Sequence, residues 1–157
     1  RLQLISSDCG ISAIVDYSHT PDGLLNALET INEFASGDVY CVVGCGGDRD
    51  ATKRPKMAQI AVEYSNHPIF TSDNPRTENP ETIIEEMEKG VEPQDFKKTV
   101  SILDRKQAIK TACQLANPND IILIAGKGHE TYQEINGVRH DFDDLKIVTE
   151  LLQQLNK

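Results

Sequence analysis

Four short stretches of this 157-residue sequence combine glycine or proline with charged side chains. They are DYSHTPD (16–22), GCGGDRD (44–50), SDNPRTEN (72–79) and GKGHE (126–130). Glycine lets the backbone approach a ligand closely, and proline restricts the conformation of a loop. Because charged groups on such loops can bind an ionic ligand, these stretches are the candidate site.

The stretch 72–79 contains the clearest chemical signal. Pro75 fixes its own φ and biases Asn74 toward an extended conformation, which makes the loop rigid. A simple turn has no use for the arginine that follows, whereas the planar guanidinium of Arg76 can bind a carboxylate through two hydrogen bonds. Asp73 can pair with an ammonium group. Together these residues predict a pocket for the zwitterionic group of an amino acid.

Two glycine-rich loops each allow a binding interpretation and a structural one. The glycines of 44–50 can form a tight turn, although the charged residues beside them include Arg49. In GKGHE, Gly126 can expose backbone N–H groups to an anion, and Glu130 can accept a hydrogen bond from an ammonium group. A structural hydrogen bond is the more common role for a lone histidine such as His129. Neither loop is specific when taken alone.

The loop 16–22 is similarly open to two interpretations. His19 precedes a predicted helix N-terminus, a position that suits an anion or a phosphate group because of the helix dipole. Alternatively, Asp16 and Thr20 cap the turn and His19 covers it. The residues alone do not decide between the two.

Short apolar runs alternate with amphipathic stretches along the chain. We predict strands at 12–17, 38–44, 67–72, 98–103 and 119–126, and helices at 20–36, 54–65, 79–91, 104–116 and from about 143 onward. Strands interleaved with helices imply right-handed crossovers and a mostly parallel sheet with helices on both faces. Ligands bind beyond the carboxyl ends of the strands in such sheets, and all four loops follow a predicted strand.

Three local patterns make more specific predictions. Residues 131–142 contain two short runs around Asn136-Gly137, which predicts a hairpin or an antiparallel edge strand. Residues 2–5 can pair with the first core strand. The predicted helices begin at the capping residues Thr20, Asn79 and Asp104. The buried stripe of the first helix is predicted to contain Leu24, Leu25, Leu28, Ile31 and Phe34.

Composition excludes several classes of function. The net charge of −9, from 25 acidic and 16 basic residues, argues against wholesale binding of nucleic acid or anionic lipid. No apolar run approaches about 18 residues, so we predict no membrane-spanning segment. The four cysteines form no CxxC pair, which disfavours a zinc site or a disulfide framework. We therefore expect a reduced, cytoplasmic protein.

Taken in order, the four loops resemble the C-terminal domain of the Mur ligase family. The resemblance covers essentially all of residues 1–157 and is carried by DYSHTPD, GCGGDRD with the KRP that follows, SDNPRTE and AGKGHE. It implies a single Rossmann-like α/β domain of about six strands, mostly parallel with one antiparallel, with helices on both faces. It also implies that the full-length ligase uses ATP and Mg²⁺ to join an incoming amino acid to UDP-MurNAc-L-Ala-D-Glu in peptidoglycan biosynthesis.

The DNPR form of the third loop is what the family uses when the added amino acid is meso-diaminopimelate. Lysine-adding relatives lack this arginine, and Arg76 would attract the distal carboxylate of diaminopimelate while repelling the ammonium of lysine. The resemblance implies a diaminopimelate site made of Arg49, Asp73, Asn74, Pro75, Arg76, Gly126 and Glu130. It also implies nucleotide contacts from Arg1, Asp16 and His19.

Other parts of the family's machinery do not occur in this sequence. The GTxGKT/S phosphate loop, the Mg²⁺ ligands, the modified lysine and the UDP-binding domain lie upstream in the family. The resemblance therefore implies no catalytic residue and no metal ligand here, and an isolated domain that is inactive. Three alternatives remain: an L-lysine-adding ligase of the same family, a free-standing amino-acid- or nucleotide-binding module, and a related amide ligase such as a folylpolyglutamate or cyanophycin synthetase.

Overall fold

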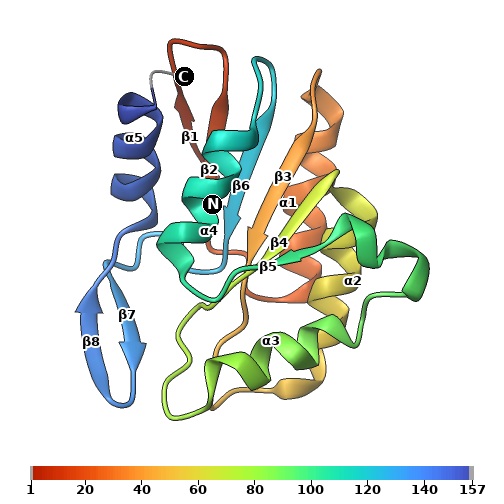
Figure 1. Cartoon of the computed structure of the whole chain (residues 1–157), viewed down its shortest axis with the longest axis vertical. Coiled ribbons are helices and arrows are strands. Elements are labelled where there is room, and N and C mark those ends of the chain that lie inside the picture. Colours follow the sequence, from red (N-terminus) through yellow and green to blue (C-terminus); the bar gives the residue numbers. More distant parts are fainter. Residues whose placement is uncertain (1, 156–157) are drawn as a thin grey trace.

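The computed structural model describes residues 2–155, and its centre is a six-stranded sheet in the order β1-β2-β6-β3-β4-β5 (Figure 1). The strands are β1 (Gln3–Ser6), β2 (Ser12–Asp16), β3 (Val39–Val43), β4 (His67–Phe70), β5 (Val100–Ser101) and β6 (Ile121–Ala125). β1 is antiparallel to β2, and the other neighbouring pairs are parallel. The predicted Rossmann-like sheet, mostly parallel with one antiparallel strand, is confirmed.

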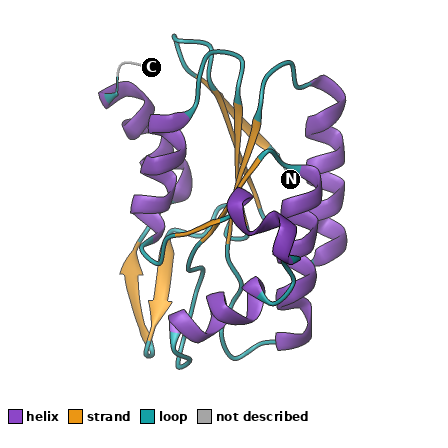
Figure 2. Cartoon of the chain, turned by 45° about the vertical axis from the view of Figure 1, so that its right-hand side comes forward, coloured by secondary structure: helices purple, strands orange, loops and turns teal. Residues whose placement is uncertain are grey.

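Helices cover both faces of this sheet, as Figure 2 shows. One face carries α1 (Pro21–Phe34), α2 (Arg54–Tyr64) and α3 (Pro80–Glu88), and the other carries α4 (Arg105–Leu115) and α5 (Asp144–Gln154). Two 3₁₀ helices, η1 (Ala51–Lys53) and η2 (Pro93–Lys98), lie in the connections. The predicted caps are confirmed, since the side chains of Thr20, Asn79 and Asp104 each accept a hydrogen bond from a backbone N–H in the first helical turn.

The central strands are buried on both faces, which explains their continuous apolar sequences. Along β6, Ile121, Leu123 and Ala125 pack into the core beneath α1–α3. Ile122 and Ile124 point the other way, into the core beneath α4 and α5. The sheet is thus held from both sides, and its strand ends are fixed relative to one another.

The predicted buried stripe of α1 is only partly correct. Leu24, Leu28 and Ile31 are fully buried, but Phe34 is 56% exposed and Leu25 is partly exposed. At about 100° per residue, positions 24, 28 and 31 centre the buried face, and positions 25 and 34 lie on its flanks. Ala27 completes the stripe instead.

The predicted strand at 98–103 is also shorter in the structure. Only Val100 and Ser101 form strand β5, and they pair with Ile69 and Phe70 of β4. β5 lies at the edge of the sheet and the preceding residues form η2, so little backbone is left to pair.

The predicted hairpin is confirmed as a separate two-stranded sheet of β7 (Tyr132–Ile135) and β8 (Val138–Asp141). Its turn residues Asn136 and Gly137 both have positive φ, 51° and 78°, as a tight hairpin turn requires. The hairpin extends from the carboxyl edge of the main sheet, at the lower left of Figure 1.

Two predictions from composition can be compared with the structure. The four cysteines are free thiols in the structure, and Cys41, Cys45 and Cys113 are buried as small apolar side chains. Within residues 2–155, no helix has the length and apolar character needed to cross a membrane.

Candidate functional site

The four predicted loops meet at one edge of the sheet, beyond the carboxyl ends of β2, β3, β4 and β6. They surround a pocket of about 450 Å³. Its lining residues are Tyr17, His19, Thr20, Gly44, Cys45, Gly46, Arg49, Asp50, Lys53, Asp73, Asn74, Arg76, Gly126 and Glu130. The structure therefore brings His19, Arg49, Asp73, Asn74, Arg76, Gly126 and Glu130 together from distant parts of the sequence.

Two other predicted site residues, Pro75 and Asp16, do not line this pocket. Pro75 does not line the pocket; its carbonyl accepts a hydrogen bond from the Glu78 N–H (3.0 Å) and faces Gly47, where an added Cβ would lie 1.9 Å from it. Pro75 thus shapes the loop that carries Arg76. Asp16 lines a neighbouring pocket. Arg1 lies outside the described residues.

Arg76 is held in a left-handed conformation, with φ of 53°. Its N–H donates to the Glu134 carbonyl (3.0 Å), and its own carbonyl accepts from the Asn136 N–H (2.7 Å). Nη1 of its guanidinium donates to the Gly47 carbonyl (2.9 Å), and Nε lies 4.0 Å from Oε1 of Glu134. Nη2 has no protein partner among residues 2–155. The hairpin therefore fixes the backbone of Arg76, while part of its guanidinium remains available to an anion.

Asp73 provides negative charge in the same pocket. The residue is 7% exposed, and its carboxylate accepts no hydrogen bond from the part of the chain that the structure describes. Burial raises the pKa of Asp73, while the positive charges of Arg105 and Lys127 act in the opposite direction. Gly126, with φ of 117°, permits the close approach, because an added Cβ would lie 2.4 Å from Oδ2 of Asp73.

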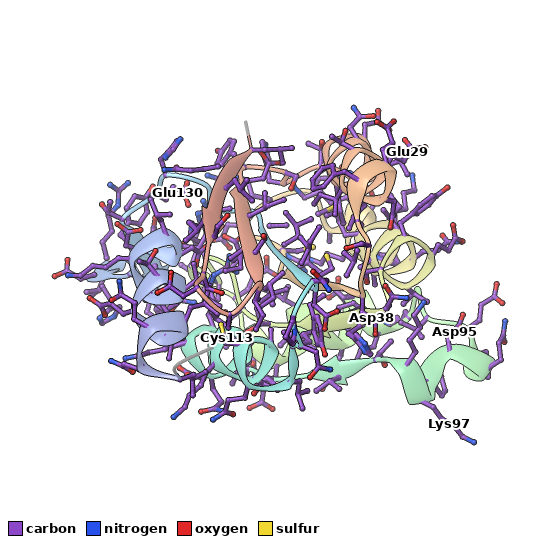
Figure 3. The ribbon with its side chains drawn as sticks, turned by 90° about the horizontal axis from the view of Figure 1, so that it is seen from above. Glu29, Asp38, Asp95, Lys97, Cys113 and Glu130 are labelled. Atoms are coloured by element: carbon purple, nitrogen blue, oxygen red, sulfur yellow. The ribbon has the colours of Figure 1, made fainter. Side chains whose placement is uncertain are left out.

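Glu130 is the second carboxylate, placed by the loop after β6 and visible at one side of the molecule in Figure 3. Its Oε1 accepts from Nδ2 of Asn74 (3.1 Å) and lies 3.5 Å from Nζ of Lys127. Its Oε2 has no protein hydrogen bond within residues 2–155. One carboxylate oxygen is thus held by the protein, and the other is not.

Two buried arginines that the sequence analysis did not predict hold the loops in place. Arg105 forms a bidentate pair with Asp144 (2.9 and 2.7 Å) and donates to the carbonyls of Ser72 and Ala125. Arg54 pairs with Glu78 (2.7 Å) and also donates to Glu86 and to the Gly46 carbonyl. Both arginines stand in the first turn of an amphipathic helix, and the sequence pattern does not distinguish them from surface residues.

The three charged residues 48–50, in the loop after β3, differ in what they contact. Asp48, with φ of 54°, accepts from the N–H and hydroxyl of Thr77, which ties two loops together. Asp50 caps η1 through the N–H of Thr52. Arg49 is exposed at the pocket, and its Nη1 donates to the Asp48 carbonyl (2.9 Å).

A second pocket of about 350 Å³ adjoins the N-terminus of α1. It is lined by Leu2, Asp16, Tyr17, Ser18, Gly23, Asn26, Ala27 and Thr30. Oγ of Ser18 is buried and has no hydrogen-bond partner in the described part of the chain. A buried hydroxyl without a partner at such a position fits a polar ligand group, such as the ribose of a nucleotide.

His19 lies at the mouth of the larger pocket. Its ring stacks at a tilt on Tyr17, with centroids 4.4 Å apart, and its Nδ1 lies 2.9 Å from the Tyr17 carbonyl. Nζ of Lys53 donates to the His19 carbonyl (2.8 Å).

Among residues 2–155, no group of three or more histidine, cysteine, aspartate or glutamate side chains is placed to hold a metal ion.

The parallel sheet and the ring of charged loops define a class of protein. The family model described as "Mur ligase, glutamate ligase domain" matches residues 1–128, and the chain belongs to the Mur ligase family.

Individual relatives carry a more particular name, UDP-N-acetylmuramoyl-L-alanyl-D-glutamate--2,6-diaminopimelate ligase. The protein of that name from Cytophaga hutchinsonii is 61% identical over 148 residues, 94% of this chain. The one from Lactiplantibacillus plantarum is 62% identical over 145 residues, 92% of this chain. A solved structure of a ligase with this name is similar over 100% of the chain, with 46% identity and a TM-score of 0.94. The chain spans only 30%, 29% and 32% of these three proteins.

Proposed function

We propose that residues 1–157 form the C-terminal, amino-acid-binding domain of an ATP-dependent ligase that adds meso-diaminopimelate to UDP-MurNAc-L-Ala-D-Glu in peptidoglycan biosynthesis. The observation that carries the proposal is the charge arrangement in the pocket of about 450 Å³. Guanidinium groups and carboxylates that the protein leaves incompletely paired face one cavity. The names of the relatives support the same substrate.

The pocket is complementary to diaminopimelate, which carries two ammonium and two carboxylate groups. In the proposal, Arg76 and Arg49 bind carboxylates, while Asp73 and Glu130 accept hydrogen bonds from ammonium groups. Gly126 lets the backbone come close to the ligand.

Arg76 is proposed to set the choice between diaminopimelate and lysine. With lysine, the same guanidinium would face an ammonium instead of a carboxylate, so one residue would provide attraction and rejection together. Losing a charge-assisted contact of this kind costs on the order of 2–4 kcal/mol.

ATP is proposed to contact this domain through Asp16 and His19, and through Arg1, which lies outside the described residues. When bound, ATP supplies the phosphoryl group that activates the acceptor carboxylate. The contribution of this chain is to bind and orient the incoming amino acid. We propose that other parts of the full-length ligase provide the Mg²⁺ ligands and the site for the UDP-linked substrate, and that the ligase works in the cytoplasm.

Calorimetric titration of the chain with meso-diaminopimelate and with L-lysine tests the proposal. We expect saturable binding of diaminopimelate and at least about thirtyfold weaker binding of lysine. The Lys97→Ala variant is the control, because Lys97 lies in η2 on the opposite side of the molecule from Glu130 (Figure 3) and its loss changes the charge without touching the pocket.

Equal or tighter binding of lysine would contradict the proposal and favour a lysine-adding ligase. If neither amino acid binds the isolated chain, the same comparison is made on the full-length ligase. Incorporation of labelled diaminopimelate and of labelled lysine is then measured under identical conditions.

A further inference from the structure

Lys127 is the most deeply buried cation of the candidate site, with 0% of its side chain exposed. Burial of an ammonium without partners is strongly unfavourable, so the groups that contact Nζ of Lys127 indicate its role. Its Nζ donates to the carbonyl of Tyr132 and to Oδ1 of Asn74 (3.3 Å), and it lies 3.5 Å from Oε1 of Glu130. The ammonium therefore makes two hydrogen bonds and has a carboxylate oxygen within ion-pair distance.

These contacts fix the orientation of the Asn74 side chain, which is buried with 2% of its residue surface exposed. Its Oδ1 accepts from Lys127 and from the N–H of Glu134 (2.9 Å), so two donors face the oxygen. Its Nδ2 donates to Glu130. Turning the amide over would point its NH₂ group at two donors and its oxygen at a carboxylate. Only one orientation is compatible with this surrounding.

The orientation matters because it directs the Asn74 NH₂ group at the Glu130 carboxylate and so holds one of its two oxygens. Oε1 is held by both Asn74 and Lys127, while Oε2 has no protein hydrogen bond within residues 2–155. Glu130 is 23% exposed in its side chain and lines the pocket. Contacts on Oε1 restrict rotation of the carboxylate of a residue that lines the pocket.

The hairpin supplies the other half of the arrangement. Besides the Tyr132 carbonyl and the Glu134 N–H, it places the side chain of Gln133, whose Nε2 donates to the Asp73 carbonyl (2.7 Å). The backbone of Arg76 forms a bridge with Ile135 on the same strand. β7 is therefore bound along the length of the loop 73–76, and Lys127 lies where strand and loop meet.

We propose that Lys127 is a positioning residue for amino-acid recognition: it locks the Asn74 amide and one oxygen of Glu130 against strand β7, so that the free carboxylate oxygen faces the ligand ammonium. The recognition step rests on the proposed function, but the locking of Asn74 does not. Lys127 itself stays out of the pocket, so its action on the ligand passes through Asn74 and Glu130.

The side-chain amide signals of Asn74 in a ¹⁵N-labelled NMR spectrum test the locking without any ligand. In Lys127→Met, we expect the two Asn74 amide protons to shift toward the positions of a free asparagine. Asn32 is the internal reference, because its Nδ2 donates to the Tyr64 carbonyl (2.9 Å) away from the site. Lys98→Met is the matched control, since Lys98 also donates from Nζ to a carbonyl, that of Val62 in α2.

Titration with meso-diaminopimelate then tests the recognition step. We expect Lys127→Met to weaken binding by about tenfold or more while the folded spectrum is retained, and Lys98→Met to bind as the wild type does. If the Asn74 signals shift as expected but diaminopimelate is neither bound by the wild-type chain nor incorporated by the full-length ligase, the positioning stands and the proposed function fails.

Unchanged Asn74 signals in Lys127→Met would overturn the proposal. Because loss of the lysine can also disturb folding, Lys127→Gln is measured as a second variant that keeps a polar donor. If both variants lose the folded spectrum, Lys127 is a folding residue and the positioning role is rejected.

Discussion

Two arginines at the same edge of the sheet differ in how the protein satisfies them. Arg105 is fully buried, and its guanidinium is occupied by the Asp144 carboxylate and by two backbone carbonyls. Arg76 is 18% exposed, and one of its terminal nitrogens has no partner in residues 2–155. A buried, complete ion pair holds structure together, whereas an incompletely paired charge at a pocket is available to a ligand.

The carboxylates of the two regions show the same contrast. Asp144 accepts two hydrogen bonds from Arg105. Asp73, at the end of β4, accepts none on its side chain from the described residues, and burial raises its pKa. The comparison teaches that charge count does not identify the site. Completeness of pairing separates the buried Arg105–Asp144 ion pair from Arg76 and Asp73, the residues proposed to recognise the ligand.

The largest predicted effect on the free energy of unfolding comes from breaking the ion pair between Arg105 and Asp144. Arg105→Met leaves the Asp144 carboxylate buried without its partner, so we expect the free energy of unfolding to fall by about 3–5 kcal/mol. Chemical denaturation measures this loss. The double variant Arg105→Met/Asp144→Leu removes both charges and should recover at least half of the loss. A single variant as stable as the wild type would show that the pair is not structural.

A smaller effect of opposite sign is expected at Asp73. Burial raises its pKa in the folded state above the unfolded value, so the folded state favours the neutral carboxyl. The stability linked to this group is fully present below the unfolded pKa and is lost as pH rises through the folded pKa. Asp73→Asn mimics the neutral form, and we expect it to be more stable than the wild type at about pH 7 and to lose that advantage near about pH 3.

Denaturation of both proteins across this pH range measures the difference. Diaminopimelate binding by Asp73→Asn should be weaker than that of the wild type at about pH 7, since the carboxylate that would accept from an ammonium is gone. The difference should shrink as pH falls, because the wild-type carboxyl then becomes neutral as well. A variant that is less stable than the wild type at neutral pH would place Asp73 with the scaffold instead.

Substitution of Arg76 should change the free energy of unfolding by a smaller amount again. Glycine adopts a φ of 53° without strain, and the substitution removes only one short hydrogen bond of the guanidinium, that to the Gly47 carbonyl (2.9 Å). The free energy of unfolding of Arg76→Gly should therefore lie within about 1 kcal/mol of the wild-type value. Asn119→Gly is a matched control, because Asn119 also has a positive φ, 79°, in a turn away from the pocket. Thermal or chemical unfolding of both variants tests this. A large loss confined to Arg76→Gly would mean that the side chain is structural.

The smallest effect is predicted at Arg49. Its side chain is exposed and donates to the neighbouring Asp48 carbonyl, so Arg49→Ala should change the free energy of unfolding by no more than about 0.5 kcal/mol. Solvent screening limits its contact with a ligand to about 1 kcal/mol, roughly a fivefold change in affinity. Calorimetry resolves a change of that size. A loss as large as that expected at Arg76 would make Arg49 the dominant carboxylate group.

Sequence reasoning was most successful where one local rule decides the outcome. The hairpin turn at Asn136-Gly137, the helix caps and the alternating strands and helices were all predicted, and the rule for open α/β sheets located the loops. Sequence reasoning failed where the burial of a charged residue depends on partners distant in the sequence. Lys127 and Arg105 look like surface residues in the sequence, yet each is buried because carbonyls and a carboxylate from other elements surround it.

The same limit applies to the shape of the predicted loop. Pro75 was expected to make the loop rigid, but the contacts that define Arg76 come from the hairpin more than fifty residues later, through Glu134 and Asn136. No local pattern could have indicated that pairing. Phe34 illustrates the converse, since its spacing matched the buried stripe although it lies on the flank of the helix face.

The most direct test is a cycle between two proteins and two ligands. Binding of meso-diaminopimelate and of L-lysine is measured calorimetrically on the wild type and on Arg76→Ala. The account predicts that the wild type prefers diaminopimelate by about 2 kcal/mol or more, roughly thirtyfold, and that Arg76→Ala loses most of this preference. A preference that persists undiminished in Arg76→Ala would contradict the central claim that the open guanidinium of Arg76 recognises the distal carboxylate.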